Sequence, residues 1–325
     1  MLFFIHSIVS VTGKQRIEMS FSTVSNQVTM IFALMAVGFL AHKWHLIHED
    51  GAKDMTRLLL YIVSPCVIIL AFEQPFSPRR LHAFAVSFLC VALTFIISII
   101  AAKLIFSRHF FPIASKRHAL KFATTYANAG FMGIPLVSAV LGAPGVFYAT
   151  TYLAGFNLFC WTHGIGLYGQ KTNQKTMLKN IFNPNIIAVL VGLGMFLGSV
   201  KLPSFLLRGV TYISQLNTPL SMIVIGDSIA VLPLLSLLND RSIWPGVFMR
   251  NLLIPLLTIL LLRAAGVNQT ALLAVTLLAA CPVAGVVVLL ALLHSDDQAF
   301  PTKLMTASTL LSLLTIPLIA MLAFL

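Results

Sequence analysis

The sequence predicts an all-α integral membrane protein of ten transmembrane helices, and three observations support this fold class. Of the 325 residues, 58% are hydrophobic and only 9% are charged, against about 25% charged residues in a typical globular protein. The apolar residues form ten runs, of which nine have about 18 to 26 residues, the length that a helix needs to cross a bilayer, and one, at 185–198, is shorter. The 21 Lys and Arg residues lie largely in the gaps between these runs. This pattern excludes a soluble globular protein, a disordered scaffold and a disulfide-stapled secreted domain.

The ten spans follow one another along the whole chain. They are residues 24–41, 55–72, 81–106, 119–141, 146–168, 185–198, 210–232, 243–262, 270–293 and 304–325. We expect helices, because a helix satisfies its backbone polar groups internally and the runs are too continuous for barrel strands. Residues 1–12 are apolar but too short to span, and no basic residue precedes them as in a signal peptide. Translation from Met19 is therefore a hypothesis.

The spans divide into two halves around a polar gap. This gives an N-terminal extension (1–20), a first five-helix repeat (21–170), a cytoplasmic linker (171–180) and a second five-helix repeat (181–325). Five spans per half place the halves in opposite orientations, which is a 5+5 inverted repeat. Prolines support the pairing, because Pro65 matches Pro219 in the second spans and Pro135 matches Pro282 in the fourth.

The net charge of +12 indicates orientation rather than nucleic-acid binding, since no soluble fold carries the charge as a basic face. With the N-terminus outside, fourteen of the 21 basic residues fall on the inner side and seven on the outer. The positive-inside rule then puts both termini on the non-cytoplasmic side. The four cysteines lie inside apolar stretches without C-x-x-C spacing, so we interpret them as small core residues rather than metal ligands or disulfides.

The fourth and ninth spans carry the residues best suited to bind a ligand. Gly130, Gly133 and Pro135 in the fourth span, and Pro282 in the ninth, predict that both helices break. Half-helix N-termini from about each proline onward would then present backbone N–H groups and partial positive charge to an anion. The alternative is a simple packing kink. The matching positions of the two prolines, and the polar Asn128 shortly before the first, favour a binding site.

The run from Asn128 to Leu136 (N-x-x-x-M-G-I-P-L), continuing to Gly142, resembles the auxin efflux carrier family. Further resemblance covers nearly the whole chain from about residue 24. It rests on Trp161, Asn183-Pro184-Asn185, Arg250 with Pro255, Ala279–Gly285 and the LLTIPL run at 313–318. The resemblance implies a fold similar to bile-acid/sodium symporters. There, helices 1, 2, 6 and 7 form a scaffold, and helices 3–5 and 8–10 form a transport domain in which broken helices 4 and 9 cross.

The same resemblance assigns roles to individual residues. In the plant carriers the Asn of this motif contacts the substrate carboxylate, which implies that role for Asn128, and second-helix residues face the substrate, which implies Pro65, Cys66 and Val67. The chain departs from the plant proteins at Val283, where they have Gln after the proline, and in lacking their long hydrophilic loop. These departures argue against the plant hormone as substrate and fit a bacterial-type member in the inner membrane.

Ionisable residues inside the spans bear on ion coupling. Asp227 lies well inside a span, where a charge is costly, so it is a coupling candidate unless it is a hydrated residue near a helix end. His163 in the fifth span is either a proton relay or a packing histidine. No carboxylate lies in either broken helix, which disfavours sodium coupling. His42, His45 and His48 recur at every third residue, but with no acid or Cys to complete a zinc site we interpret them as interfacial.

The sequence therefore predicts a secondary transporter, an efflux carrier for a small organic anion such as a mono- or dicarboxylate. The alternatives are a proton- or sodium-coupled importer of a malonate-like dicarboxylate, and a membrane sensor that binds a metabolite without moving it. No catalytic motif, metal site or cofactor is expected. The expected partners are the organic anion, the lipid bilayer and a second copy of the chain in a homodimer, with no nucleic acid.

Overall fold

The computed structural model describes residues 25–168, 178, 181–230, 240–294 and 299–325, and every regular element in these ranges is a helix. In the first half the helices are Ser25–Lys43, α2 (Glu49–Leu58), α3 (Ser64–Phe72), α4 (Pro78–Ile105), α5 (Ala114–Thr125) and α6 (Ile134–Phe159). In the second half they are α8 (Pro184–Leu197), α9 (Ser204–Ser214), α10 (Asn217–Ala230), α11 (Trp244–Phe248), α12 (Ile254–Ala264), α13 (Gln269–Ala279), α14 (Val286–His294) and α15 (Ala299–Phe324). Continuous with them are the π-helical segments η1 (Leu59–Val63), η2 (Ala129–Gly133), η3 (Cys160–Gly164) and η6 (Met249–Leu253), and the 3₁₀ turn η5 (Arg241–Ile243).

Six helices of the described ranges are long and apolar enough to cross a membrane. They are Ser25–Lys43, Asp50–Phe72, Pro78–Ile105, Ala129–Gly164, Arg241–Ala264 and Ala299–Phe324, and two shorter apolar helices are Pro184–Leu197 and Gln269–Ala279. The protein is thus an all-helical integral membrane protein, while ten separate spans are not established by helix length. Ala129–Gly164 joins parts of the fourth and fifth predicted spans, although Gly142, at φ 63°, bends the backbone within it. The hypotheses on residues 1–20, and nearly all of the predicted linker 171–180, lie outside the described residues.

Helix α4 shows how the bilayer orders side chains around a helix. Its exposed positions include Leu89, Leu93, Ile96, Ile100 and Leu104, which follow one another every three or four residues on one face. Its buried positions are mostly small or polar, and they are Ala83, Ser87, Cys90, Val91, Thr94, Phe95, Ser98 and Ala102. The buried hydroxyls donate to carbonyl oxygens one turn earlier in the same helix, so burial leaves them satisfied. An apolar exterior over a partly polar interior fits lipid as the surrounding solvent.

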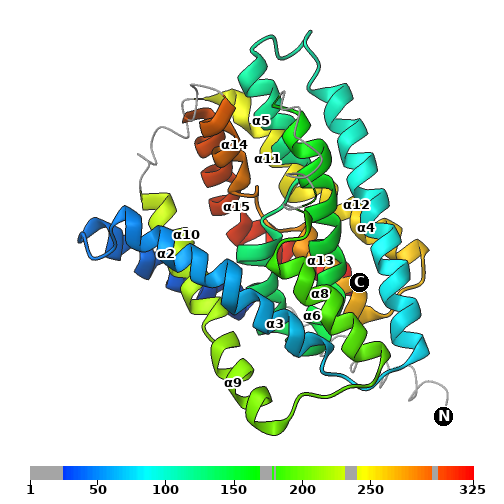
Figure 1. Cartoon of the computed structure of the whole chain (residues 1–325). Helices are drawn as coiled ribbons and strands as arrows, with labels where there is room; N and C mark the ends of the chain where they lie inside the picture. The colour runs from blue at the N-terminus through cyan, green and yellow to red at the C-terminus, as the bar shows by residue number, and fades with distance from the viewer. Residues whose placement is uncertain (1–24, 169–177, 179–180, 231–239, 295–298) are drawn as a thin grey trace, which may run out of the picture.

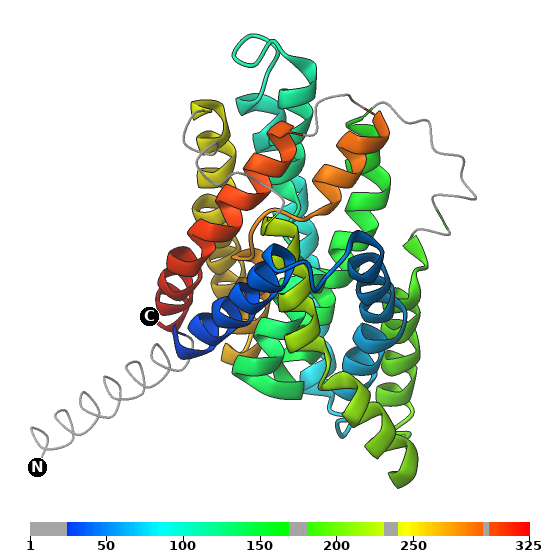
Figure 2. The same ribbon diagram turned by 90° about the vertical axis from the view of Figure 1, so that its left-hand side faces the viewer.

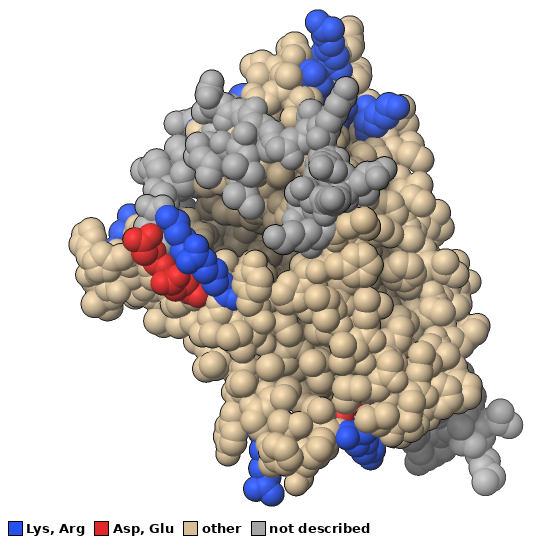
Figure 3. All heavy atoms as spheres, in the orientation of Figure 1, with Lys and Arg blue, Asp and Glu red and all other residues tan. Residues whose placement is uncertain are grey.

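The helices pack in two groups. The first contains Ser25–Lys43, which packs on α10, with α2, α3 and α8–α10, and the second contains α4–α6 and α11–α15; α6 and η2 make the most extensive contacts between the groups. Figure 1 shows α2, α3, α9 and α10 along the left and lower edge, and Figure 2 shows the same helices from the side. In Figure 3, Lys and Arg gather mainly at the two ends of the visible face and beside α2, with a broad band of other residues between them. This band suits the hydrocarbon region of a bilayer.

Glycine allows the first helix and α10 to touch backbone to backbone. A Cβ on Gly38 would lie 2.1 Å from the Ile223 carbonyl oxygen, and one on Gly226 would lie 1.9 Å from the Met35 carbonyl oxygen. No side chain fits in either place, so only glycine permits this crossing. Small residues at helix contacts are the usual basis of close packing in membranes. The contact joins the first helix to α10 within the first group.

Candidate site at two paired helix breaks

The chain leaves helical conformation at two places in the interior, and these two breaks pair with each other. Helix α5 ends at Thr125, and α13 ends at Ala279. The extended residues beyond them form an antiparallel bridge between Ala127 and Val283. The Asn128 N–H donates to the Pro282 carbonyl over 2.7 Å, and the Ala284 N–H donates to the Tyr126 carbonyl over 3.0 Å. The fourth and ninth predicted spans are therefore both broken, and they meet at their breaks.

The breaks do not lie where the prolines alone predict them. Helical structure resumes at Ala129 and at Val286, rather than at about Pro135 and Pro282. Pro135 lies inside the continuous helix Ala129–Gly164, two residues after the end of the π-helical turn η2. Pro282 lies within the extended segment, where its carbonyl accepts the bond from Asn128. Prediction of the half-helix starts at the prolines was wrong, because pairing between the two segments fixes the breaks.

Gly130 and Gly133 belong to the π-helical turn η2 that follows the first break, not to the break itself. A Cβ on Gly130 would meet no atom within 4 Å, whereas one on Gly133 would lie 2.8 Å from Leu278 Cγ on α13. Gly133 thus permits η2 to approach α13 closely. Gly130 instead borders open space beside Asn128.

Asn128 is the polar side chain at the first break. It is half-buried, and among the described residues its side-chain amide makes no hydrogen bond. Its backbone is fully used, because its carbonyl accepts from the Gly133 N–H over 3.0 Å and from the Met132 N–H over 3.2 Å. The amide therefore offers a donor and an acceptor to a ligand. This is the role that the sequence analysis expected of Asn128, and it stays a prediction.

The second break is held by a polar network from two neighbouring helices. The Val283 N–H donates to Ser308 Oγ of α15 over 3.1 Å, and Ser308 Oγ donates to Asn251 Oδ1 of η6 over 2.6 Å. The Asn251 side-chain amide donates in turn to the Ser308 carbonyl over 2.9 Å. Val283 itself is fully buried. In the structure it serves the site through its backbone N–H.

Arg250 was missed as a site residue by the sequence analysis. Its side chain is fully buried, and its guanidinium donates to the carbonyls of Thr124 over 3.2 Å, Thr125 over 3.1 Å and Ala279. These carbonyls are at the C-terminal ends of α5 and α13, just before the two breaks. The signal available in the sequence was an arginine well inside the predicted span 243–262, since intramembrane charges mark functional positions.

Pro65 and Cys66 lie near the start of α3, which packs against α8, α6 and α9. Both side chains are half-buried. Contact between this part of the chain and η2 instead runs through Phe131, which packs on a small buried cluster of Leu59, Val63 and Val224. The described contacts therefore place η1 beside the site, and a substrate-facing role for Pro65 and Cys66 stays a prediction.

The two coupling candidates have different partners. His163 Nδ1 lies 2.9 Å from the hydroxyl of Tyr126, the residue that begins the first break. Asp227 Oδ1 lies 2.8 Å from His42 Nδ1 and so links α10 to the first helix. Of these two candidates, only His163 is hydrogen-bonded to a residue of the paired breaks.

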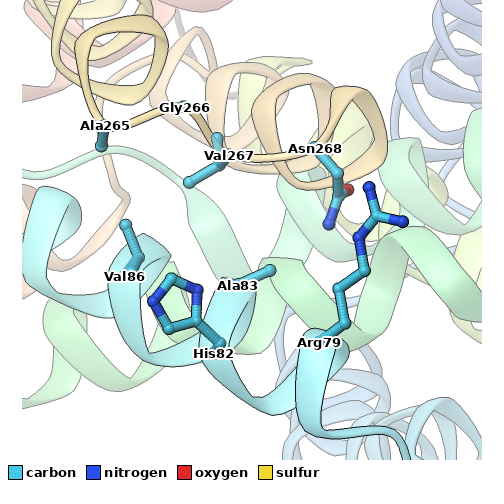
Figure 4. Close-up of a pocket in the computed structure, with 8 residues that line it drawn as sticks. All are labelled: Arg79, His82, Ala83, Val86, Ala265, Gly266, Val267 and Asn268. Carbon is cyan, nitrogen blue, oxygen red and sulfur yellow. The ribbon is translucent and has the colours of Figure 1, made fainter.

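Two hollows lie away from the breaks. A groove of about 380 Å³ between α2 and α10 is lined by Ala52, Lys53, Thr56, Arg57, Val224 and Ser228. Val224 connects it to the cluster that contacts η2. A smaller pocket of about 130 Å³ lies where α4 meets the loop before α13, with Arg79 beside Asn268 and His82 near Val86 (Figure 4). Neither lining includes a residue of the breaks.

A helical bundle with an apolar exterior and two helix breaks paired inside it is typical of multi-pass membrane transporters. Residues 23–175 and 167–320 match the family described as membrane transport protein. The chain belongs to this family, the auxin efflux carriers, whose members are transporters rather than enzymes.

Two archaeal proteins are similar to this chain, and both are named uncharacterized transporters. The one from Methanocaldococcus jannaschii is 25% identical over 222 residues, which cover 62% of this chain and 68% of the relative. The one from Methanothermobacter thermautotrophicus is 24% identical over 307 residues, or 92% of this chain and 98% of the relative. The similarity to the second relative extends over nearly the full length of both chains.

Proposed function

We propose that the protein is a secondary carrier that exports a small organic anion, such as a mono- or dicarboxylate, by alternating access. The observation that carries the proposal is the unpaired amide of Asn128, a residue whose backbone N–H pairs the two breaks by bonding to the Pro282 carbonyl. Helical structure resumes at Ala129 and Val286, so two half-helices begin next to this amide. Helix N-termini favour an anion over a cation or a neutral ligand.

Alternating access would come from movement of one helix group against the other. In this proposal α4–α6 and α11–α15 carry the paired breaks, and the first helix with α2, α3 and α8–α10 forms the scaffold. The arrangement would be a ten-helix 5+5 inverted repeat, placed in a bacterial-type inner membrane with both termini outside. Export of an anion from a negative cytoplasm gains about 2.3 kcal/mol per charge per 100 mV, so no coupling ion is needed.

Flux in proteoliposomes tests the proposal. Wild-type protein and Asn128→Ala are compared for uptake of labelled malonate and indole-3-acetate, with the membrane potential set by potassium and valinomycin. We expect voltage-driven flux in the wild type and none in Asn128→Ala, at unchanged thermal stability. Thr162→Val is the matched control, because the Thr162 hydroxyl bonds only to carbonyls of its own helix. Undiminished flux in Asn128→Ala would refute the site.

A second candidate is a proton-coupled importer of a dicarboxylate. The bond between His163 and Tyr126 favours it, because a proton on His163 would act directly on the residue that begins the first break. In that case a pH gradient would drive uptake without a membrane potential, and His163→Gln would abolish this response. Flux that follows voltage alone would exclude this candidate.

A further inference from the structure

Arg250 carries a positive charge that no acidic group in the described structure balances. Its side chain is fully buried, and none of the ion pairs among the described residues includes it. Its Nε is buried without a hydrogen-bond partner. The titratable side chains close to it are Tyr152 and Cys281, which are uncharged in their ordinary state at neutral pH. A lone buried cation is costly, so its retention calls for a reason.

The partners of Arg250 are the C-terminal ends of the two half-helices that stop at the breaks. Its guanidinium donates to Thr124 and Thr125 on α5 and to Ala279 on α13. Each helix C-terminus carries about half a negative charge, which would repel an anion bound where the two breaks pair. We call this place the crossover. The bonded guanidinium cancels this negative charge. The N-terminal ends at Ala129 and Val286 have no such cancelling group among the described ion pairs.

The π-helical turn η6 explains how one helix reaches both breaks. Arg250 and Asn251 are adjacent, and both are fully buried. A π-turn widens the helix and lets neighbouring residues point into the same interior. Arg250 reaches the ends of α5 and α13, while Asn251 holds Val283 through Ser308. One turn of helix therefore sets both the position and the charge of the crossover.

We propose that Arg250 is the positioning residue that sets the charge class of the substrate: it keeps the crossover electropositive without touching the ligand, so that an organic anion is preferred over its neutral analogue. The inference rests on the proposed carrier function. It goes further in that the bound anion becomes the counter-charge of the two half-helix N-termini, which stay positive once Arg250 has neutralised the C-terminal ends of α5 and α13.

The test compares binding of acids with binding of their amides. Purified full-length protein is titrated with malonate, malonamate and malonamide, and with indole-3-acetate and indole-3-acetamide. Dissociation constants come from the ligand-dependent rise in thermal stability. We expect the wild type to prefer each acid, and Arg250→Gln to reduce this preference at least about tenfold, equal to about 1.4 kcal/mol. Arg250→Lys keeps the charge and loses the planar fork, so it should retain most of the preference.

A second variant offsets the positive charge of Arg250 while keeping the Arg250 side chain. Asn251→Asp is nearly isosteric and adds a negative charge on the residue that follows Arg250, so it should also lower the preference for acids. The control is Arg263→Gln, which removes an exposed cation from the end of the same helix and should leave the preference unchanged.

Two failures are distinguishable. A wild type that binds acids and amides equally would overturn the anion carrier itself, and the inference with it. A wild type that prefers acids, with the same preference in Arg250→Gln or Asn251→Asp, would overturn only the inference. Arg250 would then be a structural cap of two helix ends.

Discussion

A methyl group added at Gly133 should force apart the two elements that pack at the crossover. The new Cβ would lie 2.8 Å from Leu278 Cγ and 3.4 Å from Leu278 Cδ1. Carbon atoms in contact prefer about 3.5–4.0 Å, so η2, α13 or the Leu278 side chain must shift by about 0.7 Å. Overpacking of this kind costs about 1–3 kcal/mol.

Gly130 provides the matched control, because it lies in the same π-turn and its Cβ would meet nothing within 4 Å. Replacing glycine by alanine inside a helix gains about 0.5–1 kcal/mol, and this gain is common to both positions. The difference in unfolding free energy between Gly133→Ala and Gly130→Ala therefore isolates the clash, and we expect about 1–3 kcal/mol. The assay is unfolding in mixed detergent micelles, followed by tryptophan fluorescence.

The two variants should also separate stability from binding. Gly130→Ala places a methyl group in open space two residues after Asn128, so we expect weaker anion binding without loss of stability. Combining Gly133→Ala with Leu278→Ala should cost less than the sum of the single changes, because the smaller side chain removes the clash. The reasoning would be refuted if Gly130→Ala destabilised the protein as much as Gly133→Ala, or if it bound anions like the wild type.

Two further predictions concern polar contacts away from the crossover. Replacing His42 and Asp227 by alanine, singly and together, should give a coupling free energy of about 1 kcal/mol, and strictly additive effects would show that their bond contributes nothing. At Asp240, burial works to raise the pKa, but hydrogen bonds from Lys116 and Ser242 outweigh it and hold the pKa below its ordinary value. The stability from this depressed pKa is present above the ordinary aspartate range and is lost as the pH falls through the lowered value. Lys116→Met should therefore flatten the decline in unfolding free energy between about pH 5 and 3, and parallel pH curves would contradict this.

The membrane fold was predictable from the sequence because lipid imposes its pattern on every span. Runs of apolar residues, and the leucines and isoleucines on the outer face of α4, follow directly from the solvent. The existence of a break in each half was also predictable, since Pro135 and Pro282 cannot donate a helical hydrogen bond. The local sequence does not show which segment each break pairs with. Residues 126–128 leave the helix about two turns before Pro135, because they pair with residues 282–284.

The roles of Arg250 and Asp227 were hidden for a related reason. The partners of Arg250 are backbone carbonyls, and a carbonyl has no signature in the sequence. Asp227 and His42 are 185 residues apart, so each was considered alone, one as a coupling residue and the other as an interfacial histidine. Sequence patterns identify residues that are unfavourable in their own helix, such as a charge inside a membrane span. They do not show which distant group compensates for such a residue.

A helix break inside a membrane is stable only when its exposed backbone groups find partners. At this crossover the partners are in place. The Asn128 N–H bonds to Pro282, the Ala284 N–H to Tyr126 and the Val283 N–H to Ser308, while Arg250 takes the carbonyls of Thr124, Thr125 and Ala279. The structural need for polar groups is thus met without the Asn128 side chain. An unpaired amide is costly in such surroundings unless something else completes its hydrogen bonds. A ligand that brings a carboxylate to Asn128 would do so, and it would balance the positive N-terminal ends of the two half-helices at the same time.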